Sequence, residues 1–310
     1  MKWFSLPRIS MILLSAFVAL PTHALRVATY NVRNFDYDTP SGTPTNKSEL
    51  AEILISLNAD LIGVQEIVKP DVFAEFLKTN LPDFQFVLSK CGGAHEQHLG
   101  FIYNKYKIQL LNIQEDERTM GTVKKVGDVC PTEGSRPMMV AKFRSMEGKL
   151  NLFTAISVHL KSGADGSSIG KRQLQYQEIV TALNEIRAKG EKSIMVMGDF
   201  NTTEYSASAQ GKQNFIQTFA GAQMVDLGKD TVACSNYYFN KESTGQTGEL
   251  TASVLDHILA TSEMTKQNKV APAQAQTQCL VHQCMPAKAQ DLGVTYQGVS
   301  DHCPLTTEVL

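Results

Sequence analysis

Short runs of apolar residues, many rich in valine and isoleucine, recur along the chain and are separated by polar stretches. Runs of this length are typical of buried strands. The predicted strands are Leu25–Tyr30, Leu61–Val64, Gly100–Tyr103, Val140–Phe143, Leu150–Val158, Ile194–Met197 and Val254–Leu259. Because segments with helical periodicity lie between several of these runs, the pattern predicts a layered α/β or α+β protein.

Two segments repeat apolar residues every three or four positions, the spacing of an amphipathic helix: about Ser48–Leu57 and about Ser168–Ala188. Asn46 and Glu49 are spaced as a capping box at the start of the first. A third helix, about Asp71–Thr79, is expected after Pro70, since proline suits the first position of a helix. The apolar stripes of the first two helices are expected to face the core.

Polar side chains follow four of the predicted strands. Asn31 follows the first strand, Glu66 the second and His159 the strand that ends at Val158. Asp199 and Asn201 follow the strand that ends at Met197. If these strands lie side by side, their polar groups meet at one edge of the core, where layered α/β proteins place their sites.

Carboxylates at such positions suit a hard divalent cation. Cleavage of a phosphodiester requires neutralised charge on the phosphate oxygens and an activated water. A cation held by one or two carboxylates supplies the first requirement. Glu66 and Asp301 are the candidate ligands, with Asn31 completing or supporting the shell. A lone carboxylate is more often a helix cap or a solvated charge, so the assignment depends on the whole set.

The remaining polar residues suit proton transfer and phosphate binding. Asp199 and Asn201 alternate along a segment expected to be extended, so that both side chains leave on one face. Asp199 can orient or deprotonate water, and Asn201 can donate to a phosphate oxygen. His302 is a candidate general acid or base with Asp256 as its partner, and His159 can donate to phosphate.

Three further residues are candidates for supporting roles. His159 needs an orienting group, and Glu96 or Gln97 is the nearest candidate. Arg136, directly before Pro137, can grip a flanking phosphate through its planar guanidinium, although an ordinary loop arginine is the alternative. Lys161 is a candidate for contact with the substrate.

The first 24 residues resemble a secretory signal peptide. Lys2 and Arg8 precede the apolar run Ile9–Leu20, and Thr22-His23-Ala24 offers a small-residue cleavage site. An uncleaved anchor is the alternative. No later segment reaches the roughly 20 consecutive apolar residues of a membrane helix. We therefore expect residues 25–310 to form one domain that is secreted or periplasmic, monomeric and without a stable membrane anchor.

Charge and cysteine usage narrow the classes further. The formal net charge is −2, and loss of Lys2 and Arg8 takes it to −4, which argues against a passive nucleic-acid-binding module. Six cysteines in an exported protein suggest disulfides, but the sequence does not choose among the pairings. Part of a zinc site formed by Cys279, His282 and Cys284 is the alternative, although a fourth ligand is not evident.

Six short motifs, in this order, resemble the endonuclease/exonuclease/phosphatase superfamily, typified by pancreatic deoxyribonuclease. They are Tyr30-Asn31-Val32, Val64-Gln65-Glu66, His159-Leu160-Lys161, Gly198-Asp199-Phe200-Asn201, Leu255-Asp256-His257-Ile258 and Ser300-Asp301-His302. The resemblance extends from about residue 25 to the C-terminus. It implies an α/β (α+β) four-layer sandwich, in which two mixed β-sheets pack face to face with helices on the outer faces.

The resemblance also implies roles for individual residues. Glu66 would bind a magnesium ion with Asn31 and Asp301 nearby, and manganese or calcium is the alternative ion. Asp199 and Asn201 would address the water and the phosphate.

The two histidines receive roles from the same resemblance. His302 would pair with Asp256, and His159 would be the second active-site histidine, with Glu96 as its acidic partner. Family proposals differ on which group activates the water, so His302 and Asp199 are named together. The Arg136-Pro137 pair resembles the entry to a strand where the arginine contacts substrate phosphate.

The leading functional hypothesis is an exported nuclease that cuts DNA, with RNA as a further substrate. Lys124 and Lys125 would add weak contacts beside the cleft. A sphingomyelinase-like lipid phosphodiesterase is the alternative, but no obvious exposed aromatic hairpin is present, and His257 departs from the Trp-x-Asp-Arg pattern of inositol polyphosphate phosphatases. A non-enzymatic binding protein or toxin subunit is disfavoured, because a competent residue occupies every catalytic position expected from the family.

Overall fold

The computed structural model describes residues 24–146, 150–238, 248–268 and 270–310. The predicted signal peptide, apart from Ala24, lies outside the described residues. One mixed sheet has six strands in the order β13 (Gln274–Ala275), β14 (Leu305–Val309), β1 (Leu25–Phe35), β2 (Leu61–Ile67), β4 (His98–Asn104) and β3 (Phe84–Leu88). Within it, β1 and β2 run parallel, and the other pairs are antiparallel.

The other mixed sheet also has six strands, in the order β5 (Ile108–Asp116), β6 (Met138–Ser145), β7 (Leu152–His159), β8 (Ile194–Asp199), β12 (Asp256–Thr261) and β9 (Met224–Asp226). Here only β7 and β8 run parallel. A separate two-stranded sheet joins β10 (Asn236–Tyr238) to β11 (Thr251–Ser253). Each parallel pair is connected through a helix, as a parallel crossover requires.

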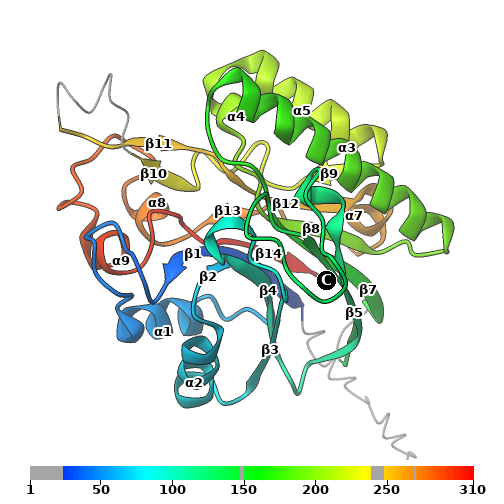
Figure 1. Ribbon diagram of the computed structural model, residues 1–310, viewed down its shortest axis with the longest axis horizontal. Coiled ribbons are helices and arrows are strands. Elements are labelled where there is room, and N and C mark those ends of the chain that lie inside the picture. Colours follow the sequence, from blue (N-terminus) through cyan, green and yellow to red (C-terminus); the bar gives the residue numbers. More distant parts are fainter. Residues whose placement is uncertain (1–23, 147–149, 239–247, 269) are drawn as a thin grey trace, which may run out of the picture.

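Helices cover the outer faces of the two large sheets. The described α-helices are α1 (Lys47–Ser56), α2 (Pro70–Asn80), α3 (Gly166–Ala188), α4 (Thr203–Ala207), α5 (Ala209–Gly221), α7 (Ser262–Asn268), α8 (Thr277–Val281) and α9 (Gly293–Gly298). Figure 1 shows α1 and α2 beside the first sheet and α3 and α5 beside the second, with the two sheets between them. Short 3-10 helices span Gly93–His95 and Glu117–Met120. No helix in these described segments is long and apolar enough to cross a membrane.

The largest apolar cluster lies between the sheets and continues under α3 and α5. The rings of Phe101 on β4 and Phe143 on β6 meet edge to face across the sheets, with centroids 5.5 Å apart. Gly63 on β2 allows close approach, because a Cβ there would lie 2.9 Å from the side chain of Met197 on β8. A second cluster packs α1 and α2 against the outer face of the first sheet. The predicted four-layer sandwich is thereby confirmed.

The predicted helices are confirmed with small shifts at their ends. Glu49 donates its backbone N–H to the Asn46 side chain at 3.2 Å, so Asn46 caps α1 as expected. The other half of the capping box is absent, because the Glu49 carboxylate accepts from Thr295 and the Asn46 N–H donates to the carbonyl of Gly298. Both contacts join α1 to the segment around α9, which leads to the C-terminal motif.

The strand registers bring the polar strand ends to one edge of the sandwich. In the first sheet, Asn31 on β1 stands opposite Gln65 on β2, directly before Glu66. In the second sheet, Asp199 on β8 stands opposite both His159 on β7 and Asp256 on β12. Since β1 and β2 also pack against β8, these residues converge at one place.

Candidate active site and metal-binding cluster

Backbone irregularities bring Asn31 and Glu66 together. Glu66 has a left-handed φ of 63°. The register of β2 shifts at this residue against both neighbouring strands, β1 and β4. The amide Nδ2 of Asn31 donates to Glu66 Oε1 at 3.0 Å and to Asp199 Oδ2 at 2.9 Å. Asn34 donates its backbone N–H to Glu66 Oε2 at 3.0 Å. Asn31 thus bridges the carboxylates of the two sheets with its nitrogen, as a support for them.

Asp199 and Asn201 meet through a turn. The expectation that both lie on an extended segment is wrong, because β8 ends at Asp199 and Asn201 adopts a left-handed φ of 54°. The backbone N–H of Asn201 donates to Asp199 Oδ1 at 2.8 Å, and its side-chain amide donates to the carbonyl of Leu160 at 3.1 Å. The turn leaves Asp199 Oδ2 directed toward the other site residues.

His302 and Asp256 form a buried dyad. The Nδ1 of His302 lies 2.8 Å from Asp256 Oδ2, and its Nε2 lies 3.8 Å from Asp199 Oδ2. Burial by itself lowers the pKa of His302, but the carboxylates of Asp256 and Asp199 outweigh burial and raise this pKa well above its ordinary value. The dyad therefore holds a cationic imidazole beside Asp199 at neutral pH.

His159 is the second buried histidine of the site. Its Nε2 lies 3.5 Å from Glu66 Oε1 and 3.6 Å from Asp199 Oδ2. Burial lowers the pKa of His159 well below its ordinary value, and the charges of Arg136 and His302 act in the same direction. His159 is therefore neutral, and its Nδ1 is buried without a hydrogen-bond partner among the described residues.

The site disfavours the ionised form of Asp199. Burial raises the pKa of Asp199 to about 7, and the nearby Asp256 and Glu66 carboxylates add to the rise while His302 opposes it. Ligand atoms of Glu66, His159 and Asp199 lie within 4.8 Å of one another, as do those of Asp199, Asp256 and His302. A divalent cation would relieve this repulsion, and oxygen donors suit a hard ion. The donor set therefore fits a metal.

Two predicted residues, Asp301 and Glu96, belong to neither group of ligand atoms. The Asp301 carboxylate pairs with Arg33 Nη1 at 2.9 Å. The Glu96 carboxylate is 61% exposed and lies 3.6 Å from His98 Nε2, so it does not approach His159. Gln97, the other candidate partner, donates to the side chain of Asn34 at 2.7 Å.

The predicted cations differ in their placement. Arg136 is within electrostatic reach of Glu66 and Asp199; burial lowers the pKa of Arg136 and the two carboxylates oppose that effect. Its Nε has no hydrogen-bond partner within the described ranges. Lys161 instead donates to the carbonyl of Ser162 at 2.7 Å. Lys124 donates to the carbonyl of Glu117, and Lys125 pairs with Glu115.

Sequence reasoning missed several residues that shape the site. Arg33 forms an ion pair with Asp301, and the backbone N–H of Asn34 donates to Glu66. Ser235 donates to Asp256 Oδ2 at 2.8 Å. Arg33 and Asn34 lie two and three residues after Asn31, and this proximity was the available signal. Ser235 had no such signal, because it lies far along the chain from Asp256.

The six cysteines form three disulfides in the structure: Cys91–Cys130, Cys234–Cys284 and Cys279–Cys303. Cys279 and Cys284 therefore belong to different disulfides. The alternative of a zinc site with His282 is wrong, because the thiolates that it needs are oxidised.

A protein that can hold a divalent cation beside a buried acid and base is equipped to hydrolyse phosphate esters. The sequence matches the model of the endonuclease/exonuclease/phosphatase family over residues 28–302, and the chain belongs to this family. The resemblance found in the motifs is thereby confirmed. The protein is a phosphoesterase of the divalent-metal-dependent class.

Solved structures share the fold at low sequence identity. An endonuclease/exonuclease/phosphatase from Bacteroides vulgatus is 18% identical, with a TM-score of 0.62 and coverage of 93% of this chain and 99% of that one. D. rerio TDP2 complexed with a single-strand DNA product is 15% identical, with a TM-score of 0.59 and the same coverages. A mannosyl-6-phosphatase from Bacteroides thetaiotaomicron is 17% identical, with a TM-score of 0.59 and coverages of 92% and 99%. No curated protein matches the chain.

Proposed function

We propose that this protein is an exported nuclease that hydrolyses phosphodiester bonds of DNA, with RNA as a further substrate and magnesium as its ion. The observation that carries the proposal is the pairing of a cationic His302 with Asp199 beside a half-buried Arg136. A phosphodiester anion needs positive groups for its oxygens and a proton acceptor for the attacking water. The proposal is supported by D. rerio TDP2, which has a similar fold and whose structure is that of a complex with a single-strand DNA product.

Each site residue takes a part in this proposal. Glu66 would hold the cation, which when bound neutralises charge on the phosphate oxygens. Arg136 binds a phosphate oxygen through its guanidinium, and the neutral His159 donates one N–H to another. The charge distribution favours Asp199 as the acceptor of the proton from water, and the cationic His302 stabilises the phosphate and protonates the leaving oxygen. Asn31 holds the Glu66 and Asp199 carboxylates in place.

Export and the polymeric substrate rest on separate support. The three disulfides favour an oxidising compartment, in agreement with the expected signal peptide. A negative net charge makes local cations and the metal responsible for binding the phosphate backbone. We infer a monomer without a membrane anchor.

The proposal is tested with purified residues 25–310 and four substrates: plasmid DNA, RNA, sphingomyelin and a sugar phosphate, each with magnesium or with a chelator. We expect cleavage of DNA that the chelator abolishes. Cleavage of sphingomyelin alone would replace the nuclease by a lipid phosphodiesterase, and release of phosphate from the sugar phosphate alone would make it a phosphomonoesterase.

Metal binding is tested by Glu66→Gln, which keeps the shape of the side chain but removes a charge. We expect this variant to need at least about tenfold more magnesium for half-maximal cleavage, because a carboxylate binds a hard cation better than an amide does. Glu75→Gln is the matched control, since the Glu75 side chain is 70% exposed on α2. Equal magnesium requirements of the Glu66 variant and the wild type would remove Glu66 from the metal site.

A further inference from the structure

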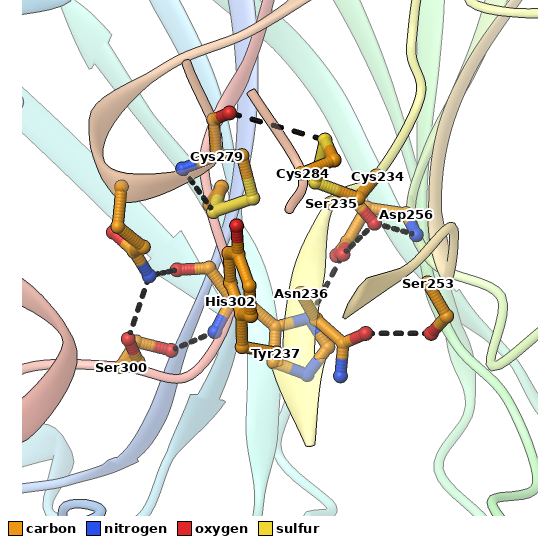
Figure 2. Close-up of a disulfide and its surroundings, with 12 residues drawn as sticks. Cys234, Ser235, Asn236, Tyr237, Ser253, Asp256, Cys279, Cys284, Ser300 and His302 are labelled. Atoms are coloured by element: carbon orange, nitrogen blue, oxygen red, sulfur yellow. Dashed lines mark hydrogen bonds and ion pairs between the residues drawn. A yellow bond between two sulfur atoms is a disulfide. The ribbon is translucent and has the colours of Figure 1, made fainter. Parts of the chain in front are cut away.

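Ser235 is a fully buried residue beside the His302 and Asp256 dyad, and each of its own polar groups forms a hydrogen bond. Its hydroxyl accepts from the backbone N–H groups of Leu255 and Asp256, at 2.9 and 2.8 Å. The same hydroxyl donates to Asp256 Oδ2 at 2.8 Å, the oxygen that also faces His302 Nδ1. Figure 2 shows Ser235 in this position, with Cys234 directly beside it.

The hydroxyl of Ser235 restrains the Asp256 carboxylate through the same oxygen that faces the histidine. Asp256 Oδ1 is buried and has no hydrogen-bond partner in the part of the chain that the structure describes. Only Oδ2 therefore carries contacts, from Ser235 and from His302. Because one oxygen receives both, rotation of the carboxylate would break both contacts together.

The backbone of the Ser235 segment also connects the two segments that carry the dyad. Ser235 donates its N–H to the carbonyl of Ser253, three residues before Asp256, at 2.8 Å. Its own carbonyl accepts from the N–H of Cys303, the residue after His302, at 2.7 Å. Tyr237 donates its N–H to the carbonyl of Asp301 at 2.9 Å. One short segment thus sets the distance between His302 and Asp256.

Two disulfides hold this arrangement from both ends. Cys234, which precedes Ser235, is bonded to Cys284, and Cys303, which follows His302, is bonded to Cys279. Cys279 and Cys284 lie close along the chain: Cys279 is within α8, and Cys284 follows the end of this helix. This segment therefore clamps both the Ser235 strand and the His302 segment.

Gln278, directly before Cys279, adds a polar contact to the same clamp. Its side-chain amide donates to the carbonyls of Ser300 and His302, at 3.1 and 3.0 Å. The backbone around His302 is therefore held by hydrogen bonds that Gln278 donates and that the Ser235 carbonyl accepts, as well as by a disulfide.

We propose that Ser235 is the positioning residue of the His302 and Asp256 dyad, and that the Cys234–Cys284 and Cys279–Cys303 disulfides keep it in place. The inference rests on the proposed function, in which this dyad takes part in hydrolysis. Ser235 acts through Asp256, so its removal lowers the turnover number and leaves substrate binding by Arg136 and the metal unchanged.

The first experiment is a double-mutant cycle of Ser235→Ala and Asp256→Asn, with kcat and KM measured on plasmid DNA. We expect Ser235→Ala to lower kcat about tenfold and to leave KM within about twofold, because a hydrogen bond to a charged group is lost. In the Asp256→Asn background the serine change should lower kcat no further. An unchanged kcat, or an equal loss in both backgrounds, overturns the inference.

A second measurement does not depend on activity. The proton on His302 Nδ1, assigned by its loss in His302→Asn, gives a separate NMR resonance, and Ser235→Ala should shift it. If the wild type cleaves no phosphodiester but this resonance shifts, the proposed function fails and the positioning role stands. An unshifted resonance contradicts the positioning role whatever the activity.

The disulfides are tested by paired replacement. Cys279→Ala with Cys303→Ala should lower kcat at least about tenfold more than Cys91→Ala with Cys130→Ala, because the second pair flanks neither residue of the dyad. Both are assayed at a temperature at which circular dichroism shows them folded. Equal kcat values for the two variants contradict the role of the disulfide, and if the first variant does not fold, the serine cycle and the resonance decide.

Discussion

Two buried histidine and aspartate pairs stand on opposite faces of β12. His302 pairs with Asp256 at 2.8 Å, and His257 pairs with Asp226 at 3.2 Å. Asp256 and His257 are neighbours in sequence, and successive side chains of a strand point to opposite faces of its sheet. Asp256 therefore faces the site, while His257 faces the layer of α5.

The pairs differ in what the second ring nitrogen does. Nε2 of His302 points toward Asp199 at 3.8 Å, beyond hydrogen-bond distance. Nε2 of His257 lies 2.8 Å from the hydroxyl of Thr202, and the His257 ring packs on Phe215, with centroids 4.4 Å apart. A histidine whose nitrogens are both engaged can stabilise the fold but has no nitrogen left for a substrate. We therefore propose that the pair of His302 and Asp256 serves chemistry and that the pair of His257 and Asp226 stabilises the fold.

The largest expected effect comes from His302→Asn. This change removes the cationic group and should lower kcat at least about a hundredfold, since general acid or base catalysis contributes on this order. His257→Asn should leave kcat within about threefold at temperatures at which it is folded. Initial rates of plasmid cleavage with saturating magnesium measure both. A larger loss in the His257 variant would invalidate the division between the two pairs.

A smaller effect, on stability, is expected from Asp226→Asn. Removing a buried carboxylate that accepts several hydrogen bonds costs about 2 kcal/mol of unfolding free energy at neutral pH. Asp230→Asn is the control, because the Asp230 side chain is 80% exposed, and it should cost less than about 0.5 kcal/mol. Urea unfolding of each variant gives these values, and equal costs would contradict a stabilising role of the pair.

The pH dependence of the same variant has a definite sign. Burial raises the pKa of Asp226. His257 and hydrogen bonds from Gly228 and Tyr205 lower this pKa by a larger amount, so that the net shift is downward. The stabilisation from the ionised carboxylate is therefore present above its ordinary pKa and is lost as the pH falls through the depressed value. The difference in stability between wild type and Asp226→Asn should shrink on acidification, as urea unfolding along a pH series would show.

The smallest effect is expected from Glu96→Gln, which concerns a third histidine, His159. Because the Glu96 carboxylate faces His98 and solvent, its neutralisation should change kcat on plasmid DNA by less than about twofold. A loss of tenfold or more would show that Glu96 approaches the site during catalysis. Such a result would give His159 a carboxylate partner after all, as the family resemblance suggested.

Much of the fold could be predicted because its signals are local. The apolar runs that become β1, β2, β7 and β8 are largely buried and continuous. The Asn46 cap of α1 and the proline at the start of α2 are local signals as well. Short edge strands such as β9, with three residues, were not predicted, because an element of that length has no readable periodicity. Such short strands form because they pair with neighbouring strands, and not because of a pattern in their own residues.

The amino-acid sequence by itself determined which groups are available: carboxylates, amides and histidines in family order at the ends of buried strands. Only the tertiary structure decided their partners, because hydrogen bonds and charge shifts depend on distances between residues far apart in the chain. In the structure Asp301 forms an ion pair with Arg33, Asp256 accepts a hydrogen bond from Ser235, and the cysteines form one set of disulfides. Left-handed turns at Glu66 and Asn201, which periodicity does not reveal, aim the groups at a single point.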